Sequence, residues 1–268
     1  MRPLAFVLLL ASVALAVEWQ TDLDKALAQA RKDGKPVAVL VADEGSAKSF
    51  DSEKKLEGVL AVRLDATKDR EKAARYQPRG LPTVVFLSPR GVIVDRAEKA
   101  TAEAVSKALD ALGEKAKAAD EELAKLETCK KGPPEENLKN EDALAEFWAK
   151  HENWAEAVPL LEDVVKQAGD LEFPPDTRLA RWLELARGQA VLLRYDDAVK
   201  TAESAAKHAS TQRKVEPMQK AYIFIGWCRE QQEKKAEAIK AYDDAARIAP
   251  QTLAGKTAAA ARDRLKQP

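Results

Sequence analysis

The sequence predicts two domains: an α/β domain with a central mixed sheet and flanking helices, followed by an all-α domain of repeated helix pairs. An apolar, β-branched run, Val84–Leu87, lies between Pro82 and the Ser88–Gly91 turn, and Val92–Val94 returns as a second strand. Ahead of this hairpin, strand and helix patterns alternate, which is typical of a three-layer α/β domain. From residue 141 onward the pattern is helical and recurs at intervals of about forty residues.

Composition and charge exclude several classes of function. The 268 residues include 44 Lys+Arg and 44 Asp+Glu, so no net charge attracts nucleic acid or an anionic membrane. Two cysteines and two histidines leave little material for a metal site. We therefore expect no cofactor, no metal and no nucleic-acid partner.

Residues 1–16 have the pattern of a signal peptide. Arg2 is a minimal basic region, Leu4–Val13 is a short apolar run, and Ala14-Leu15-Ala16 matches a cleavage site. The apolar run is short for crossing a bilayer. We expect cleavage after Ala16 and a periplasmic or secreted mature protein with no further span. The alternative is that the segment stays as an N-terminal anchor.

Residues 17–113 form the predicted α/β domain. Thr21 is expected to cap the first helix, with Asp24 in the reciprocal position, and Gly34 ends this helix. The continuous apolar run Val37–Val41 predicts a strand that is buried on both faces. The other elements follow in order: a helix over 45–57, a strand over 59–64, a helix over 68–76, the hairpin, and a helix over 101–112.

This stretch resembles the thioredoxin-like domains, and among them the subgroup related to exported disulfide reductases. The resemblance rests on features that follow the order of the family: Trp19, Ala26, Ala30, Gly34-Lys35-Pro36, Asp65 and Gly80-Leu81-Pro82-Thr83. It implies that Leu81 and Pro82 form a cis-proline loop ahead of the hairpin.

One departure from this family decides the chemistry. By the family's register Gly45 and Lys48 occupy the positions of the Cys-x-x-Cys pair, and no cysteine occurs in residues 1–128. Thiol–disulfide exchange needs an attacking thiolate and a resolving thiol, so this domain cannot carry it out. A nucleophile at Ser46 or Ser49 would need a base, and the domain contains no histidine. We interpret these serines as helix caps and expect no catalytic residue.

Residues 114–140 are predicted to be a helical extension followed by a linker. Apolar residues at intervals of three and four form a seam: Leu109, Leu112, Ala116, Ala119, Leu123 and Leu126. We favour a solvated extension of the preceding helix over a dimer seam, because two alanines weaken the seam. Gly132 and the prolines after it end the helix, and residues 132–140 form the linker.

Residues 141–268 contain three similar units and resemble tetratricopeptide (TPR) repeats. Three alanines in equivalent positions lie 41 and then 40 residues apart: Ala157, Ala198 and Ala238. This period exceeds the family's usual value of about 34 residues, and we attribute the excess to longer turns at 169–176 and 210–217. Residues 252–265 resemble a capping helix. The resemblance implies a curved groove that holds an extended peptide or a partner helix.

The first helix of the third unit is apolar on nearly every side, so more than one of its faces is covered. The family's register places Tyr222, Ile225 and Gly226 in the core. The residues expected to bind a partner in the groove are Leu183, Arg187, Ile223, Phe224 and Trp227. The alternative is that the capping helix or the α/β domain already covers this face.

Cys129 and Cys228 are the only cysteines, and export would permit a disulfide between them. The alternative for Cys228 is a buried free thiol at a position where the repeat has a small residue.

The predicted function is that of an exported, non-enzymatic adaptor that binds a protein or extended peptide with its repeats. The alternative is an accessory factor of thiol-redox or chaperone pathways that binds extended substrate at the cis-proline loop. An enzyme with an unrecognised site at Gly45–Ser49 has the weakest support, because no acid, base or metal constellation accompanies it.

Overall fold

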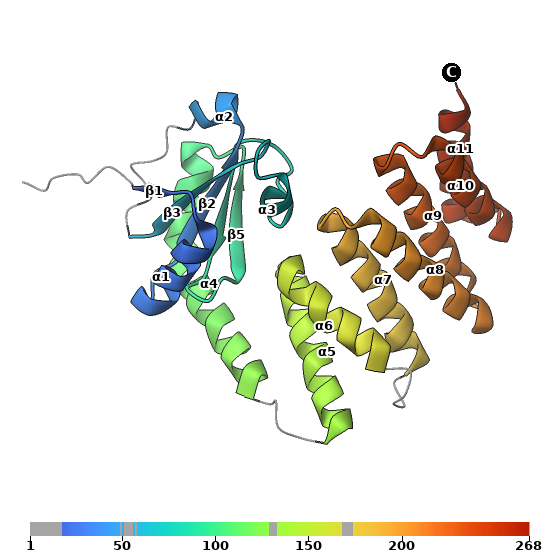
Figure 1. The fold of residues 1–268 in the computed structure, drawn as a ribbon, viewed down its shortest axis with the longest axis horizontal. Helices are drawn as coiled ribbons and strands as arrows, with labels where there is room; N and C mark the ends of the chain where they lie inside the picture. Colours follow the sequence, from blue (N-terminus) through green and yellow to red (C-terminus); the bar gives the residue numbers. More distant parts are fainter. Residues whose placement is uncertain are drawn as a thin grey trace, which may run out of the picture.

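The computed structural model describes residues 18–48, 50, 56, 58–128, 133–167 and 174–267. A five-stranded mixed sheet with flanking helices makes up the N-terminal part, and an array of helix pairs makes up the rest (Figure 1). Among the described residues, no helix combines the length and the apolar composition needed to cross a bilayer.

The sheet has the strand order β1-β3-β2-β4-β5. Its strands are β1 (Trp19–Gln20), β2 (Val37–Ala42), β3 (Leu60–Asp65), β4 (Thr83–Leu87) and β5 (Ile93–Glu98). β3 is parallel to β1 and β2, whereas β4 is antiparallel to both β2 and β5. Every residue of β2 and β4 is buried, which explains why these strands read as continuous apolar runs in the sequence.

Four helices accompany the sheet: α1 (Leu23–Asp33), α2 (Glu44–Lys48), α3 (Arg70–Ala74) and α4 (Ala102–Thr128). Side chains alternate across β2, so Val39 packs with α1 and α3, while Leu40 packs with the start of α4 on the other face. The expected central mixed sheet with flanking helices is therefore present.

Two helix ends differ from the sequence expectation. Asp22, and not Thr21, caps α1, because its carboxylate accepts the N–H of Lys25 at 3.1 Å. Of the helix expected over 45–57, the described residues contain α2, Glu44–Lys48; Phe50 lies outside it, buried, with its ring 5.9 Å from the ring of Trp19. Residue 49 and residues 51–55 and 57 lie outside the described residues.

The helix expected over 68–76 is shortened at both ends to α3. Its first expected residues form a turn instead, because the Asp65 carboxylate accepts the N–H groups of Thr67 at 2.9 Å and Lys68 at 3.1 Å. These bonds hold the pKa of Asp65 below its ordinary value.

The helix does extend beyond residue 113, as expected, but the expectation that this extension is solvated is wrong. α4 continues unbroken to Thr128, and the seam along it is buried inside the chain. Ala119 and Leu123 pack in one cluster with Leu144 and Trp148 of the next helix. The seam is apolar because it receives the first helix pair of the repeat array.

The repeat array consists of α5 (Pro134–Lys150), α6 (Trp154–Gln167), α7 (Pro175–Val191), α8 (Tyr195–Thr211), α9 (Val215–Gln231), α10 (Lys235–Ile248) and α11 (Leu253–Lys266). Residues 134–140, assigned above to the linker, belong to α5. The expected capping helix is α11, which begins after its N-cap Thr252. In Figure 1 the helices stack one after another from α5 to α11.

The long repeat period does not come from a long turn at 210–217. α8 and α9 are 17 residues each and are joined by residues 212–214 alone. Pro217 lies in the first turn of α9, where the missing N–H leaves no bond unmade. The other expected long turn, 169–176, lies partly outside the described residues, and α7 begins within it, at Pro175.

Two glycines allow the helices to approach closely. A Cβ placed on Gly188 would lie 2.6 Å from Cε3 of Trp154, and one on Gly226 would lie 2.7 Å from Cε1 of Tyr242. Large aromatic side chains thus fill the space that the missing side chains leave.

The sheet domain and the repeat array are joined through the turn between β4 and β5. Asn153, at the start of α6, accepts the N–H of Ile93 at 2.9 Å and donates to the carbonyl of Gly91 at 3.0 Å. The ring of His151 donates to the carbonyl of Ile93 at 3.0 Å. Val92 is fully buried in the same cluster as Trp148.

The close approach at Gly188 can be tested with alanine. Gly188→Ala forces the new methyl group into Trp154 and should lower the free energy of unfolding by about 1–3 kcal/mol. Gly113→Ala is the matched control, because Gly113 also lies in a helix but a Cβ there meets nothing within 4 Å. The control should be stabilised by up to about 1 kcal/mol. Chemical denaturation of the variants measures both, and equal effects would contradict the packing described here.

Candidate protein-binding cleft

An exposed aromatic cluster lies on the repeat array. Trp227 of α9 is 40% exposed, although it is among the largest apolar side chains of the protein. Its ring lies 5.8 Å from Phe224 and 6.1 Å from Tyr195, which begins α8. We call these three residues the aromatic cluster. Two of them, Phe224 and Trp227, are among the residues expected from the sequence to bind a partner.

The structure does not bring the other three expected residues into this cluster. Leu183 packs in a separate cluster with Leu179 and Met218, and Ile223 packs towards α11. The guanidinium of Arg187 lies 5.4 Å from the ring centre of Trp154, in a cation–π arrangement. The alternative that the capping helix covers the apolar face of α9 holds in part, because α11 packs on Ile223 but leaves Trp227 exposed.

A cleft of about 670 Å³ lies beside the aromatic cluster, and we call it the α3 cleft. One wall is α3 with the turn before it, and the other is formed by Leu193 and Tyr195 together with Gln231 at the end of α9. Gln231 lies four residues after Trp227, so both are on the same face of α9. The aromatic cluster thus borders the α3 cleft, and Tyr195 belongs to both. Figure 1 shows α3 on the side of the sheet domain that faces the helix pairs.

The wall made by α3 is densely charged. It carries five consecutive charged residues: Lys68, Asp69, Arg70, Glu71 and Lys72. Lys68 pairs with Asp65 at 3.5 Å, whereas Arg70 and Lys72 form no ion pair with any described residue. Burial raises the pKa of Tyr195, and the nearby positive charge of Arg70 opposes this rise. The α3 cleft therefore joins an aromatic edge to two cations that are available to a partner.

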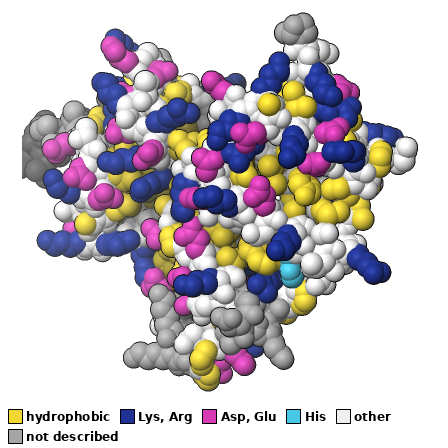
Figure 2. Space-filling model, turned by 45° about the vertical axis from the view of Figure 1, so that its right-hand side comes forward, with side chains coloured by type: hydrophobic (Ala, Val, Ile, Leu, Met, Phe, Trp, Pro, Cys, Tyr) yellow, Lys and Arg dark blue, Asp and Glu magenta, His cyan; other side chains and the backbone are white. Residues whose placement is uncertain are grey.

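Charges are mixed over the rest of the visible surface. Figure 2 shows Lys and Arg interspersed with Asp and Glu, without a large region of one sign, and shows hydrophobic side chains gathered in patches between them. A surface of this kind favours local recognition of a partner over long-range attraction of a polyanion.

The residues around the cis-proline loop form a second region of interest. The Leu81–Pro82 peptide bond is cis, and Leu81 is 37% exposed. Thr83 pairs with Val41, so Pro82 lies close to the end of β2 and the start of α2. α2 carries Gly45 and an exposed Lys48, whose ammonium group pairs with Glu44 at 2.9 Å.

Ser46 forms a reciprocal capping pair with Asp43. The Asp43 carboxylate accepts the N–H and the hydroxyl of Ser46 at 2.7 Å each, and the Ser46 hydroxyl accepts the N–H of Asp43 at 3.0 Å. These bonds lower the pKa of Asp43, so it is a weaker base than an ordinary aspartate. The geometry is that of a helix start.

Cys228 is completely buried among the repeats, in the cluster that contains Ala186 and Val199. Burial raises the pKa of its thiol to about 12. Cys129 lies outside the described residues, so the disulfide between the two stays a prediction. Within the described ranges, no group of three or more His, Cys, Asp or Glu side chains is arranged to hold a metal ion.

Sequence reasoning missed Tyr195 and the whole wall formed by α3. Tyr195 lies in the repeat motif Arg194-Tyr195-Asp196, where it read as a structural position. The residues of α3 read as a solvated charged helix. Only the docking of the sheet domain on the repeats brings them opposite Tyr195, and no local pattern carries that information.

The sequence matches no family model and no curated protein. Among solved structures, PlcR of Bacillus thuringiensis in complex with the peptide PapR7 and DNA shares 18% identity, with a TM-score of 0.39 over 55% of this chain and 53% of PlcR. A kinesin light chain of Podosopora anserina with nearly identical TPR-like repeats shares 21% identity, with a TM-score of 0.46 over 57% and 76% of the two chains. BtubC (BKLC) from P. vanneervenii shares 16%, with a TM-score of 0.39 over 53% and 60%.

These similarities are loose, and this chain spans only about half the length of PlcR. The similarities do not bear on what the array binds.

The burial of Cys228 predicts an unreactive thiol. In a Cys129→Ser variant, the native protein should not react with DTNB at pH 8, because the side chain is inaccessible and its thiolate is scarce at that pH. The same variant unfolded in guanidinium chloride should release one equivalent of the coloured product. Rapid reaction of the folded variant would show that α9 is not packed as described.

Proposed function

We propose that this chain is a non-catalytic binding protein that holds an extended segment of a partner protein in the α3 cleft. The observation that carries the proposal is the exposed Trp227 at the border of the cleft, whose ring meets Tyr195 edge to face and Phe224 at a tilt. Burying an exposed tryptophan against a partner is among the largest single contributions that a residue makes to an interface.

The shape and charge of the α3 cleft favour an extended segment over a compact small molecule. The cleft is open to solvent and lies between two parts of the protein, with Leu193 and Tyr195 on one wall and a row of ions on the other. An extended chain can place an apolar side chain on the aromatic cluster while a neighbouring acidic side chain or carbonyl oxygen meets Arg70 or Lys72.

We further propose that the N-terminal domain is a thioredoxin-like domain without redox activity, and that the protein is exported. The order and directions of the strands, the cis bond before β4 and the position of α2 after β2 support the first proposal. Gly45 and Lys48 then stand at the two cysteine positions. The pattern of residues 1–16 supports export, and the mature chain would begin at Val17.

The aromatic cluster can be tested by photo-crosslinking. A photoreactive phenylalanine analogue at Gln231, inside the α3 cleft, should capture a partner from the exported fraction of the native host. Trp227→Ala should reduce this capture by about tenfold or more, because a truncated hot spot costs at least about 1.4–2 kcal/mol. Leu253→Ala is the matched control, since Leu253 is 82% exposed but lies at the start of α11 and does not line the cleft.

Capture that is lost with Trp227→Ala and retained with Leu253→Ala supports the proposal. Capture that is equal in the two variants contradicts it. Circular dichroism of the variants checks that the fold is retained, which we expect because both side chains are exposed.

The absence of redox activity can be tested with insulin. The purified chain with dithiothreitol should precipitate insulin no faster than dithiothreitol alone, because neither a nucleophilic nor a resolving thiol is present at Gly45 and Lys48. A Cys129→Ser, Cys228→Ser double variant should behave identically. Catalytic turnover by the natural chain would overturn the proposal for this domain without affecting the α3 cleft.

A further inference from the structure

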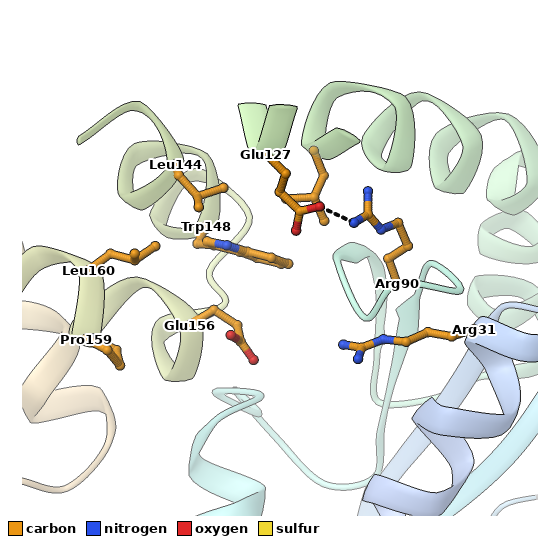
Figure 3. A pocket seen from close by; sticks show the side chains of 9 residues that line it. Arg31, Arg90, Glu127, Leu144, Trp148, Glu156, Pro159 and Leu160 are labelled. Carbon is orange, nitrogen blue, oxygen red and sulfur yellow. Dashed lines mark hydrogen bonds and ion pairs between the residues drawn. The ribbon is translucent and has the colours of Figure 1, made fainter. Parts of the chain in front are cut away.

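A second cavity lies where the sheet domain meets the first helix pair, α5 and α6. We call it the junction cavity; its volume is about 410 Å³. It lies between α1, the β4–β5 turn, α4, α5 and α6, so residues from both domains line it (Figure 3). The junction cavity shares no lining residue with the α3 cleft, on which the proposed function rests.

Two opposite charges face the junction cavity from opposite walls. Arg31 extends from the last turn of α1, and Glu156 extends from the first turn of α6 towards the same space (Figure 3). Neither forms an ion pair with any residue that the structure describes. The third ion, Arg90, is different because its guanidinium is already bound to Glu127. A cation and an anion are therefore left available in one cavity.

Apolar side chains line the part of the cavity that α5 and α6 form. Trp148 projects into it between the two walls, with Leu144 and Leu160 beside its ring (Figure 3). Trp148 is 8% exposed, so its ring is held in place by the surrounding helices. An apolar group that enters between Arg31 and Glu156 would contact this ring.

A smaller hollow of about 100 Å³ shares Arg31, Arg90, Trp148 and Glu156 with the junction cavity. Trp154 also lines it, and the indole N–H of Trp154 is buried with no hydrogen-bond partner among the described residues. A buried donor without a partner is uncommon and costs stability, which is a sign that an acceptor is missing.

We propose that the junction cavity binds a free α-amino acid with an apolar side chain, such as leucine. The carboxylate of the ligand pairs with Arg31, its ammonium group pairs with Glu156, and its side chain packs on Trp148 and the neighbouring leucines. Both polar contacts are charge-assisted hydrogen bonds, the stronger class in proteins. The cavity volume lies within the range of about 300–1,000 Å³ that is usual for small-molecule sites.

The two charges decide in favour of this class of ligand. A simple anion would meet Arg31 but would be repelled by Glu156, and a simple cation would have the reverse difficulty. A molecule that carries both signs, with an apolar part beside them, satisfies the two ions and the indole ring together. Because Arg31 and Glu156 are both exposed to solvent, we expect weak binding that is sensitive to salt.

Isothermal titration calorimetry of the full chain with L-leucine tests this proposal. Binding should saturate, and Arg31→Met or Glu156→Gln should each weaken it by about tenfold or more, as the loss of one charge-assisted bond predicts. The matched controls are Lys32→Met and Asp163→Asn, which remove an exposed charge from the same two helices without touching the cavity. Both controls should bind like the natural chain.

Two analogues of leucine separate the contributions of the charges. 4-Methylpentanoate lacks the ammonium group and isopentylamine lacks the carboxylate, so each should bind at least about tenfold more weakly than leucine. Equal binding of leucine and either analogue would overturn the proposal, as would the absence of saturable heat at ligand concentrations up to about 10 mM, beyond which a site would be too weak to matter. Stability of Arg31→Met and Glu156→Gln equal to that of their controls, with leucine binding lost, confirms a ligand site over a purely structural role.

The outcome is independent of the α3 cleft. Trp227→Ala should bind leucine normally, because the aromatic cluster lies outside the junction cavity. Failure of leucine binding in the natural chain would leave the proposed partner-binding function untouched.

Discussion

The docking of the β4–β5 turn on the repeat array determines how the rest of the molecule is arranged. Asn153 occupies the position before α6, where an asparagine often caps its own helix, but its side-chain amide instead bonds Gly91 in the turn and Ile93 at the start of β5. Ser88 donates to Asp120 of α4 across the same turn. Each bond contributes only about 1 kcal/mol, yet together they fix a direction, because hydrogen bonds are lost when the angle changes.

This fixed direction creates the α3 cleft and the junction cavity. With the turn docked, α3 faces the helices that carry Tyr195 and Trp227, and α1 faces the helix that carries Glu156. Residues about 125 positions apart in the chain thereby line one space. Residues of both domains line each of these two spaces. The recognition surfaces are thus properties of the joined pair and depend on a few polar contacts at its centre.

Local patterns in the sequence predicted most elements, and long-range packing explains the errors. The apolar run of β4 and the evenly spaced alanines from Ala157 specify a buried strand and paired helices, because burial imposes a period that is visible in the sequence. The burial of the α4 seam inside the chain was not predicted, because the same apolar spacing occurs whether the seam packs on a second copy of the chain or on the next helix of the same chain. Trp227 could be predicted as a binding residue because an aromatic side chain on the groove face of a repeat is a common anchor. Tyr195 and Arg31 could not, because their proposed roles depend on the docking that brings α3 opposite Tyr195 and Glu156 opposite Arg31.

Three ionisable groups that the sequence or the clefts brought into question, Asp43, Tyr195 and Cys228, have pKa values shifted away from neutrality. Hydrogen bonds lower the pKa of Asp43, and burial raises the pKa of Tyr195 and takes that of Cys228 to about 12. General acids, bases and nucleophiles work best when their pKa values move towards neutrality, and these three move away from it. Such shifts hold each group in one protonation state over the physiological range. That constancy suits the proposed binding function, in which a surface must present the same hydrogen-bonding and apolar groups to a partner at all times.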